Sequence, residues 1–139
     1  MDYAAYQTVL DVVKMTSAYF DLDVEIWCET GDLWDSLAEC ENHGAGVFTI
    51  HLNKEFLESE DEAELVRVVA HEMVHVKQFE QDNLCLEDSM YSMHGVEYNG
   101  DYWFSPWEIE ARGYQDAFLQ HFYSSNAEKT SWQTMLNQL

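Results

Sequence analysis

The segment from about Asp61 to about Gln81 is apolar on almost every side when it is drawn as a helix, and no other feature constrains the fold as strongly. Six of its polar residues form one narrow stripe, namely Glu64, Arg67, His71, His75, Gln78 and Asp82. A surface helix would not need apolar side chains around most of its circumference. We therefore predict a long, mostly buried helix whose histidines lie on its only polar line.

The same helix contains the sequence His71-Glu72-Met73-Val74-His75, which is an H-E-x-x-H motif whose two histidines lie on the polar stripe. Histidines four positions apart lie one turn apart on the same helix face, so both imidazoles can reach one metal ion. Glu72 is rotated by about 100° from His71, so it can reach a water molecule activated by the metal without being a ligand. Buried imidazoles without a partner would be costly. A metal ion satisfies them, and hydrogen bonds to neighbouring carboxylates are the alternative.

A second long helix supplies candidates for a third ligand, because a catalytic zinc usually has three protein ligands. We predict that this helix opens at Ser105-Pro106, since proline is favoured at the first helical position, and that it runs to about Tyr123. Its apolar face consists of Trp107, Ala111, Tyr114, Phe118 and Phe122. Glu108 and Glu110 lie on opposite shoulders of that face, so periodicity alone does not choose between them.

Both glutamates also have ordinary structural interpretations. Glu108 is placed to form a capping box with Ser105 or to pair with Arg112 one turn later. Glu110 is placed to be solvated or to lie near His121. Gln78 shares the histidine face of the first helix and is a candidate to support a ligand.

The remaining pattern indicates one more helix, two strands and a hairpin, in a chain whose 139 residues favour a single domain over 1–139. The predicted elements are a helix over 3–20, strands over 24–28 and 46–52 with an acidic loop over 29–45 between them, and a hairpin over 96–104 around Asn99-Gly100. This order does not alternate as βαβ units do. We therefore predict an α+β fold, with a small sheet and a hairpin packed on the two long helices.

Charge excludes several classes of function. The chain has 27 acidic against 6 basic residues, a formal net charge of −21, so binding to nucleic acid or to anionic membranes is not expected. Six of the ten residues over 55–64 are acidic. An acidic surface favours solubility, and it also favours basic peptides or a basic protein as partners.

Neither a membrane span nor a secretory signal is expected, because no apolar run approaches about 20 residues and the first residues lack a basic region. We therefore expect a cytoplasmic protein. The three cysteines, Cys28, Cys40 and Cys85, match no zinc or disulfide framework. Free thiols in a reducing compartment fit this number best, and a Cys28–Cys40 bridge is left open.

The H-E-x-x-H motif, followed some tens of residues later by a glutamate on another helix, resembles the gluzincin metallopeptidases. The blocks ELVRVVAHEMVHVKQ and NGDYWFSPWEIEAR are similar to small predicted metallopeptidases encoded by bacteriophages, and the resemblance covers about residues 46–122. In several related families the distal motif is E-x-x-A, whose first glutamate binds zinc, and the sequence from Glu108 to Ala111 matches it. The chain departs from the thermolysin-type distal motif and lacks the third ligand of the metzincins.

The resemblance implies a zincin-like (minigluzincin) fold and zinc-dependent hydrolysis of peptide bonds. His71, His75 and Glu108 would hold Zn²⁺, with Glu110 as the alternate third ligand, and Glu72 would act as the general base. The strand over 46–52 would offer its edge to an extended peptide substrate. Four side chains are candidates to stabilise the oxyanion, and none is assigned: Tyr98, Tyr102, Tyr114 and His94.

Two other functions stay open at this stage. The first is a zincin-like structural or regulatory protein with little activity, such as a phage particle component or an assembly factor that acts in the host cell or virion. The second is an acidic binder of a basic partner in which zinc is only structural. A comparison of cleavage by the intact protein and by a Glu72→Gln variant separates the first of these from a peptidase. The oligomeric state does not follow from the sequence.

Overall fold

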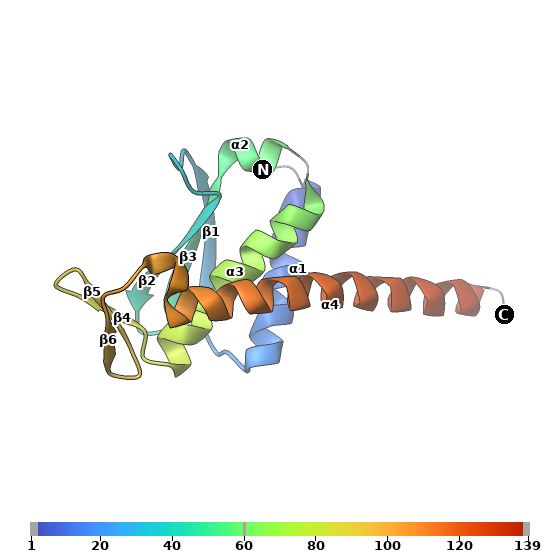
Figure 1. Cartoon of the computed structure of the whole chain (residues 1–139). Coiled ribbons are helices and arrows are strands. Elements are labelled where there is room, and N and C mark those ends of the chain that lie inside the picture. Colours follow the sequence, from blue (N-terminus) through green and yellow to red (C-terminus); the bar gives the residue numbers. More distant parts are fainter. Residues whose placement is uncertain (1–2, 60, 138–139) are drawn as a thin grey trace.

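The predicted buried helix is present as α3 (Glu62–Gln81), which lies in the middle of the molecule (Figure 1). The computed structural model describes the backbone of residues 3–59 and 61–137, and the side chains of the same residues up to 125. Helix α3 begins after Asp61, whose side chain accepts a hydrogen bond from the backbone N–H of Glu64 and so caps the helix. Six of its apolar side chains are completely buried, namely Val66, Val69, Ala70, Met73, Val74 and Val76.

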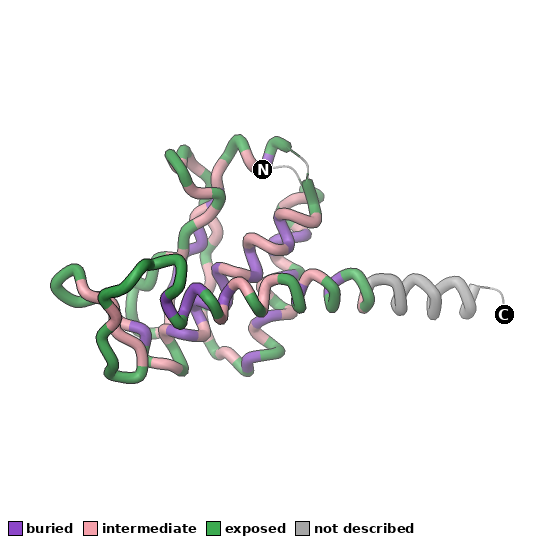
Figure 2. The backbone as a smooth tube through the Cα atoms, viewed as in Figure 1, coloured by how far each residue is buried: buried purple, intermediate pink, exposed green. Residues whose placement is uncertain are grey.

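Within the described residues, three further helices accompany α3 and the sheet, which makes the protein a mixed α+β structure (Figure 1). They are α1 (Tyr3–Phe20), the short α2 (Lys54–Glu58) and α4 (Pro106–Asn137). Helix α4 begins at the predicted proline but continues past Tyr123, so the predicted end is wrong. No glycine or proline follows Gly113 to interrupt it. Figure 2 shows the buried residues concentrated along α3 and at the start of α4.

The main sheet has three strands, β1 (Glu25–Gly31), β2 (Ala38–Gly44) and β3 (Val47–Asn53), in the spatial order β1-β3-β2. Strand β1 runs parallel to β3, and β2 runs antiparallel to it. One face of β3 is apolar and joins the core of α1 and α3 through Phe48, Ile50 and Leu52. The two strands predicted over 24–28 and 46–52 are therefore confirmed as β1 and β3.

Strand β2 corrects two expectations from the sequence. The predicted loop over 29–45 contains this strand, in which only Ala38 and Cys40 join the apolar core and most of the other residues are polar or acidic. The turn into β3 places Gly44, Ala45 and Gly46 at positive φ. Because β3 is paired on both sides, it offers no edge to a substrate, and the edge strands of this sheet are β1 and β2.

A second, smaller sheet consists of β4 (Cys85–Glu87), β5 (Met90–Met93) and β6 (Val96–Tyr98). Its two turns have positive φ at Asp88 and Ser89 and at His94 and Gly95, which suits two-residue hairpins. The predicted hairpin around Asn99-Gly100 is wrong, because this dipeptide follows β6. There Asp101 caps a short 3₁₀ turn, Tyr102–Phe104, that leads into α4.

The cysteines are free in the structure. Cys28 on β1 and Cys40 on β2 both lie opposite Ile50, with β3 between them. Two strand spacings separate them by about 10 Å, which is too far for a disulfide. The bridge left open by the sequence is therefore excluded in this arrangement.

Among the described residues, no helix is both long enough and apolar enough to span a membrane.

Candidate metal centre

Three side chains from two helices meet at one point between α3 and α4. His71 Nε2 lies 3.2 Å from one carboxylate oxygen of Glu108, and His75 Nε2 lies 3.0 Å from the other. The two imidazole rings are 4.9 Å apart and nearly perpendicular. One ligand atom from each residue lies within 4.8 Å of the other two, and no other group of His, Cys, Asp or Glu in the described part of the chain meets this condition.

Glu108 reaches the histidines because the first turn of α4 is anchored in the protein interior. Trp107 and Ala111, on either side of Glu108 in sequence, are almost fully buried. The backbone N–H of Glu108 donates to Ser105 Oγ at 3.4 Å, which is one half of the capping box considered from the sequence. A carboxylate in the first turn of a helix is also favoured by the helix dipole.

Glu110, the alternate third ligand, turns to the other side of α4. Its Oε1 lies 3.1 Å from Lys77 Nζ and accepts a hydrogen bond of 3.1 Å from Gln78 Nε2. Arg112 does not pair with Glu108 as considered. Its guanidinium stacks at 3.7 Å over the ring of Trp103 and donates to the carbonyl oxygen of the same residue. The structure therefore places Glu108, and not Glu110, with the histidines.

Two glutamines fix the orientation of the imidazole rings. His75 Nδ1–H donates to Gln78 Oε1, and His71 Nδ1–H donates to Gln115 Oε1, both at 2.7 Å. The amide of Gln78 is itself oriented, because its Nε2 donates to the carbonyl oxygen of Trp107 at 2.9 Å. Each histidine thus presents Nε2 to Glu108, which is the arrangement typical of metal-binding histidines.

Gln115 was missed by the sequence analysis. It lies two turns after Glu108 on the same helix, so the face that carries Glu108 also carries Gln115. That spacing is the signal that would have found it. The polar stripe of α3 faces α4 in the same way at Arg67, which pairs with Asp116 at 2.9 Å.

The three residues influence one another's pKa values. Burial would lower the pKa of His71 and His75, but hydrogen bonds to Glu108 and the glutamines raise it above its ordinary value. Burial would likewise raise the pKa of Glu108, yet the two histidines hold it well below the usual range. The carboxylate therefore stays charged, and the two Nε2 atoms are matched to it either by protons or by a metal cation.

Glu72 lies beside this group without joining it. Its side chain is 8% exposed, and burial raises its pKa to about 7, against the opposing effect of the two nearby histidines. A carboxylate with a pKa near 7 is suited to take up and release a proton near neutral pH. Burial also raises the pKa of the neighbouring Cys40 thiol, which stays protonated.

A cleft of about 480 Å³ opens above these residues. It lies between β2 on one side and the small sheet, the 3₁₀ turn and the start of α4 on the other. Its lining residues are Ser36, Ala38, Glu39, Cys40, His71, Glu72, His75, Phe79, Leu84, Tyr91, Tyr102, Trp107 and Glu108.

Only one of the four oxyanion candidates lines this cleft. The hydroxyl of Tyr102 donates to Glu108 at 2.8 Å, and burial together with this bond raises the pKa of Tyr102. Tyr98 donates instead to the backbone of Asp101, and Tyr114 packs against Phe118. His94 is mostly exposed, near Asp82. Tyr91, which the sequence analysis did not consider, packs against the ring of Trp107 and also lines the cleft.

We expect replacement of Gln115 by leucine to weaken zinc binding by about 10- to 100-fold, because His71 loses the acceptor that orients its ring. Competition with a chromophoric chelator measures the affinity. Gln120→Leu, an exposed glutamine on the same helix, is the matched control and should leave the affinity unchanged. Equal affinities for the two variants would show that Gln115 does not support the ligand.

No protein-family model, curated protein or solved structure matches this chain. The chemistry open to the site is that of its donors, which are two oriented imidazole nitrogens and a buried carboxylate beside a second carboxylate.

Proposed function

We propose that this protein is a zinc-dependent peptidase with a zincin-like arrangement of its two long helices. The observation that carries the proposal is the convergence of His71 Nε2, His75 Nε2 and the Glu108 carboxylate beside Glu72, at the bottom of a cleft bordered by the edge of a sheet. The resemblance of the two sequence blocks to gluzincin metallopeptidases supports it.

The donor set suits zinc better than magnesium or calcium. Two imidazole nitrogens and one carboxylate are a ligand set that Zn²⁺ uses in catalytic sites, whereas the harder cations prefer oxygen donors. The histidines and Glu108 would hold the ion. When bound, zinc would supply a Lewis acid that polarises a carbonyl group and makes a water molecule more acidic.

Glu72 is the residue proposed to move the proton. Its carboxylate is buried and lines the cleft, within the field of both histidines. It would accept a proton from the attacking water and then deliver that proton to the nitrogen of the departing amine. The adjacent cation would favour its charged form, so Glu72 would be ready to act as a base near neutral pH.

Strand β2 is proposed to bind the substrate backbone. Asn53 N–H donates to the carbonyl of Leu37, so in the alternating pattern of an antiparallel pair the main-chain groups of Ala38 and Cys40 point to the free edge. Both residues line the cleft. An extended peptide could pair with this edge, and the small side chains of Ala38 and Cys40 would leave it room.

Tyr102 is proposed to stabilise the charge that develops on the carbonyl oxygen of the substrate. Its hydroxyl lies in the cleft beside Glu108, and its raised pKa keeps it protonated, so it remains a donor at neutral pH. The stacking of Arg112 on Trp103 holds the 3₁₀ turn that carries Tyr102.

The zinc-loaded protein is expected to cleave peptides in a mixed library of unstructured sequences. Because the site chemistry depends on the metal, a chelator should abolish the cleavage, and added zinc should restore it. Mass spectrometry of the products measures the cleavage. Basic peptides are expected to be cleaved faster than acidic ones, given the net charge of −21. A fully zinc-loaded protein that cleaves no member of the library would contradict the proposal.

A further inference from the structure

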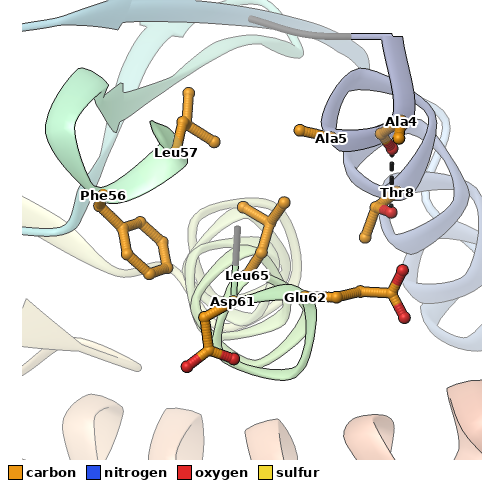
Figure 3. A pocket seen from close by; sticks show the side chains of 8 residues that line it. All are labelled: Ala4, Ala5, Thr8, Phe56, Leu57, Asp61, Glu62 and Leu65. Carbon is orange, nitrogen blue, oxygen red and sulfur yellow. Dashed lines mark hydrogen bonds between the residues drawn. The ribbon is translucent and has the colours of Figure 1, made fainter. Parts of the chain in front are cut away.

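A second pocket lies at the opposite end of α3 from the cleft, where α1, α2 and the first turn of α3 meet (Figure 3). Its volume is about 480 Å³. Leu57 from α2, Leu65 from α3 and Ala5 from α1 point toward one hollow (Figure 3), and the two leucines are 8% and 5% exposed. Leu65 precedes the two histidines by about two to three turns of helix, roughly 9–15 Å along its axis. The pocket is therefore separate from the proposed metal centre.

The rim of this pocket is acidic. Asp61 and Glu62 belong to its lining, and they lie within the most acidic run of the sequence, residues 55–64. Both are exposed at the surface but oriented by hydrogen bonds, because Asp61 caps α3 and Glu62 accepts a bond of 3.0 Å from the Tyr123 hydroxyl. Their positions are therefore fixed while their charges face solvent.

The charges on the rim are not neutralised within the described part of the molecule. None of its ion pairs involves Asp61, Glu62 or the neighbouring Glu55 and Glu58. Three of the described cations are engaged by other partners. Arg67 binds Glu64 and Asp116, and Lys77 binds Asp82 and Glu110, while Arg112 stacks on Trp103.

We propose that this pocket is a docking site for a basic amphipathic helix of a partner protein. A large aliphatic or aromatic side chain of that helix would fill the hollow formed by Leu57, Leu65 and Ala5. Lysines or arginines one turn away would pair with Asp61 and Glu62. The acidic rim repels an anionic amphiphile, and it repels the same rim on a second copy of this chain, so charge complementarity selects a cationic partner.

The test uses a fluorescent amidated peptide of about 14 residues, made of leucine and lysine, with its leucines on one face of a helix. Fluorescence anisotropy measures its binding to the full chain in the presence of a chelator, so the proposed metal centre is not engaged. A peptide of the same composition, with its leucines distributed around the helix, is the control ligand. We expect the amphipathic peptide to bind at least about tenfold more tightly.

Two variants separate the apolar hollow from its charged rim. Ala4→Trp fills the hollow from an exposed position on α1 without changing any charge. Asp61→Asn with Glu62→Gln removes the rim charges, and it keeps the helix cap, since asparagine caps as well as aspartate. The matched control is Glu87→Gln with Asp88→Asn, which removes the same charge from exposed positions on the small sheet, none of which lines the pocket.

We expect the hollow and rim variants each to weaken binding by about tenfold or more, and the remote charge variant to change it by less than about twofold. His71→Ala should bind like the wild type, so a failed peptidase proposal would leave this result intact. Binding that is unaffected by Ala4→Trp, or reduced equally by both charge variants, would show only general attraction to an acidic protein and would overturn the proposal. A dimer that Ala4→Trp dissociates would overturn it in favour of a second copy.

Discussion

Replacement of His71 by alanine is expected to abolish stoichiometric zinc binding, and replacement of Glu108 by alanine is expected to do the same. Each change removes one of three converging donors, with distances of 3.0 and 3.2 Å between the histidine nitrogens and the Glu108 oxygens. Loss of a supporting residue costs up to about 100-fold in metal affinity, so loss of a ligand should cost more than that. The wild-type protein, reloaded with zinc, should hold one ion per chain.

The measurement is the metal content of each protein after reloading and removal of loosely bound ions. Glu110→Gln is the matched control for Glu108→Ala, because Glu110 lies two positions away and pairs with Lys77 instead. Glutamine there can still accept the hydrogen bond from Gln78. Full retention of zinc by Glu108→Ala, with loss in Glu110→Gln, would move the third ligand to Glu110. No zinc in the reloaded wild type would remove the basis of the peptidase proposal.

The same site gives zinc binding a defined direction of pH dependence. The ligating form of histidine is neutral, and in the metal-free protein the contacts to Glu108 raise the pKa of both His71 and His75 above 6.5. Protons therefore compete with zinc at a higher pH than they would at imidazoles with an ordinary pKa. Zinc affinity should fall steadily as the pH is lowered, with protons released on binding.

Elements with local sequence signals could be predicted, and elements defined by distant partners could not. Helix α3 could be predicted from the periodicity of its apolar residues, and β1 and β3 from their apolar, β-branched residues. Strand β2 was missed because its polar and acidic residues are typical of a loop. Only its pairing with β3 makes this segment a strand. The turn at His94-Gly95 likewise depends on pairing of β5 with β6, whereas Asn99-Gly100 carries the stronger local hairpin signal.

The residues of the candidate site also differ in whether local sequence could predict them. His71, Glu72 and His75 are four residues apart at most, so helix geometry alone brings them together. The choice of Glu108 over Glu110 depends on how α4 is rotated against α3, which burial of Trp107 and Ala111 determines. Periodicity places both glutamates at the margin of that buried face. It does not determine how α4 is rotated about its axis, and so it does not choose between them. Strand β2 and the two tyrosines that line the cleft, Tyr91 and Tyr102, come from other parts of the chain, so no local pattern could place them beside the histidines.

Replacement of Glu72 by glutamine is expected to lower kcat for peptide cleavage by about 10²- to 10⁴-fold, which is the usual contribution of a general base. Glutamine has nearly the same shape but cannot accept the proton of the attacking water. Zinc content should stay at the wild-type level, since Glu72 is not one of the converging donors. Rates of cleavage of the fastest library peptide, measured on protein of known zinc content, provide the test.

Stability separates the chemical role of Glu72 from a structural one. Burial raises the pKa of this group to about 7, which means that the folded protein disfavours its charge. A folded-state pKa above the unfolded value makes the carboxyl destabilising as the pH rises above the unfolded pKa, and glutamine removes that effect. The metal-free variant should therefore unfold at a denaturant concentration equal to or higher than the wild type. Lower stability together with lower activity would indicate a packing defect instead.

The pH profile distinguishes Glu72 from the other cleft residue that is proposed to act on the substrate. In the wild type kcat should fall as the pH is lowered, because the base must be unprotonated, and the bound cation should place this decline below pH 7. Tyr102→Phe removes a donor but leaves the base, so it should lower kcat by about 10²- to 10³-fold and retain the acid limb. In Glu72→Gln, kcat should be low at every pH and should no longer decline as the pH is lowered. A limb that survives in Glu72→Gln would assign the base to another group.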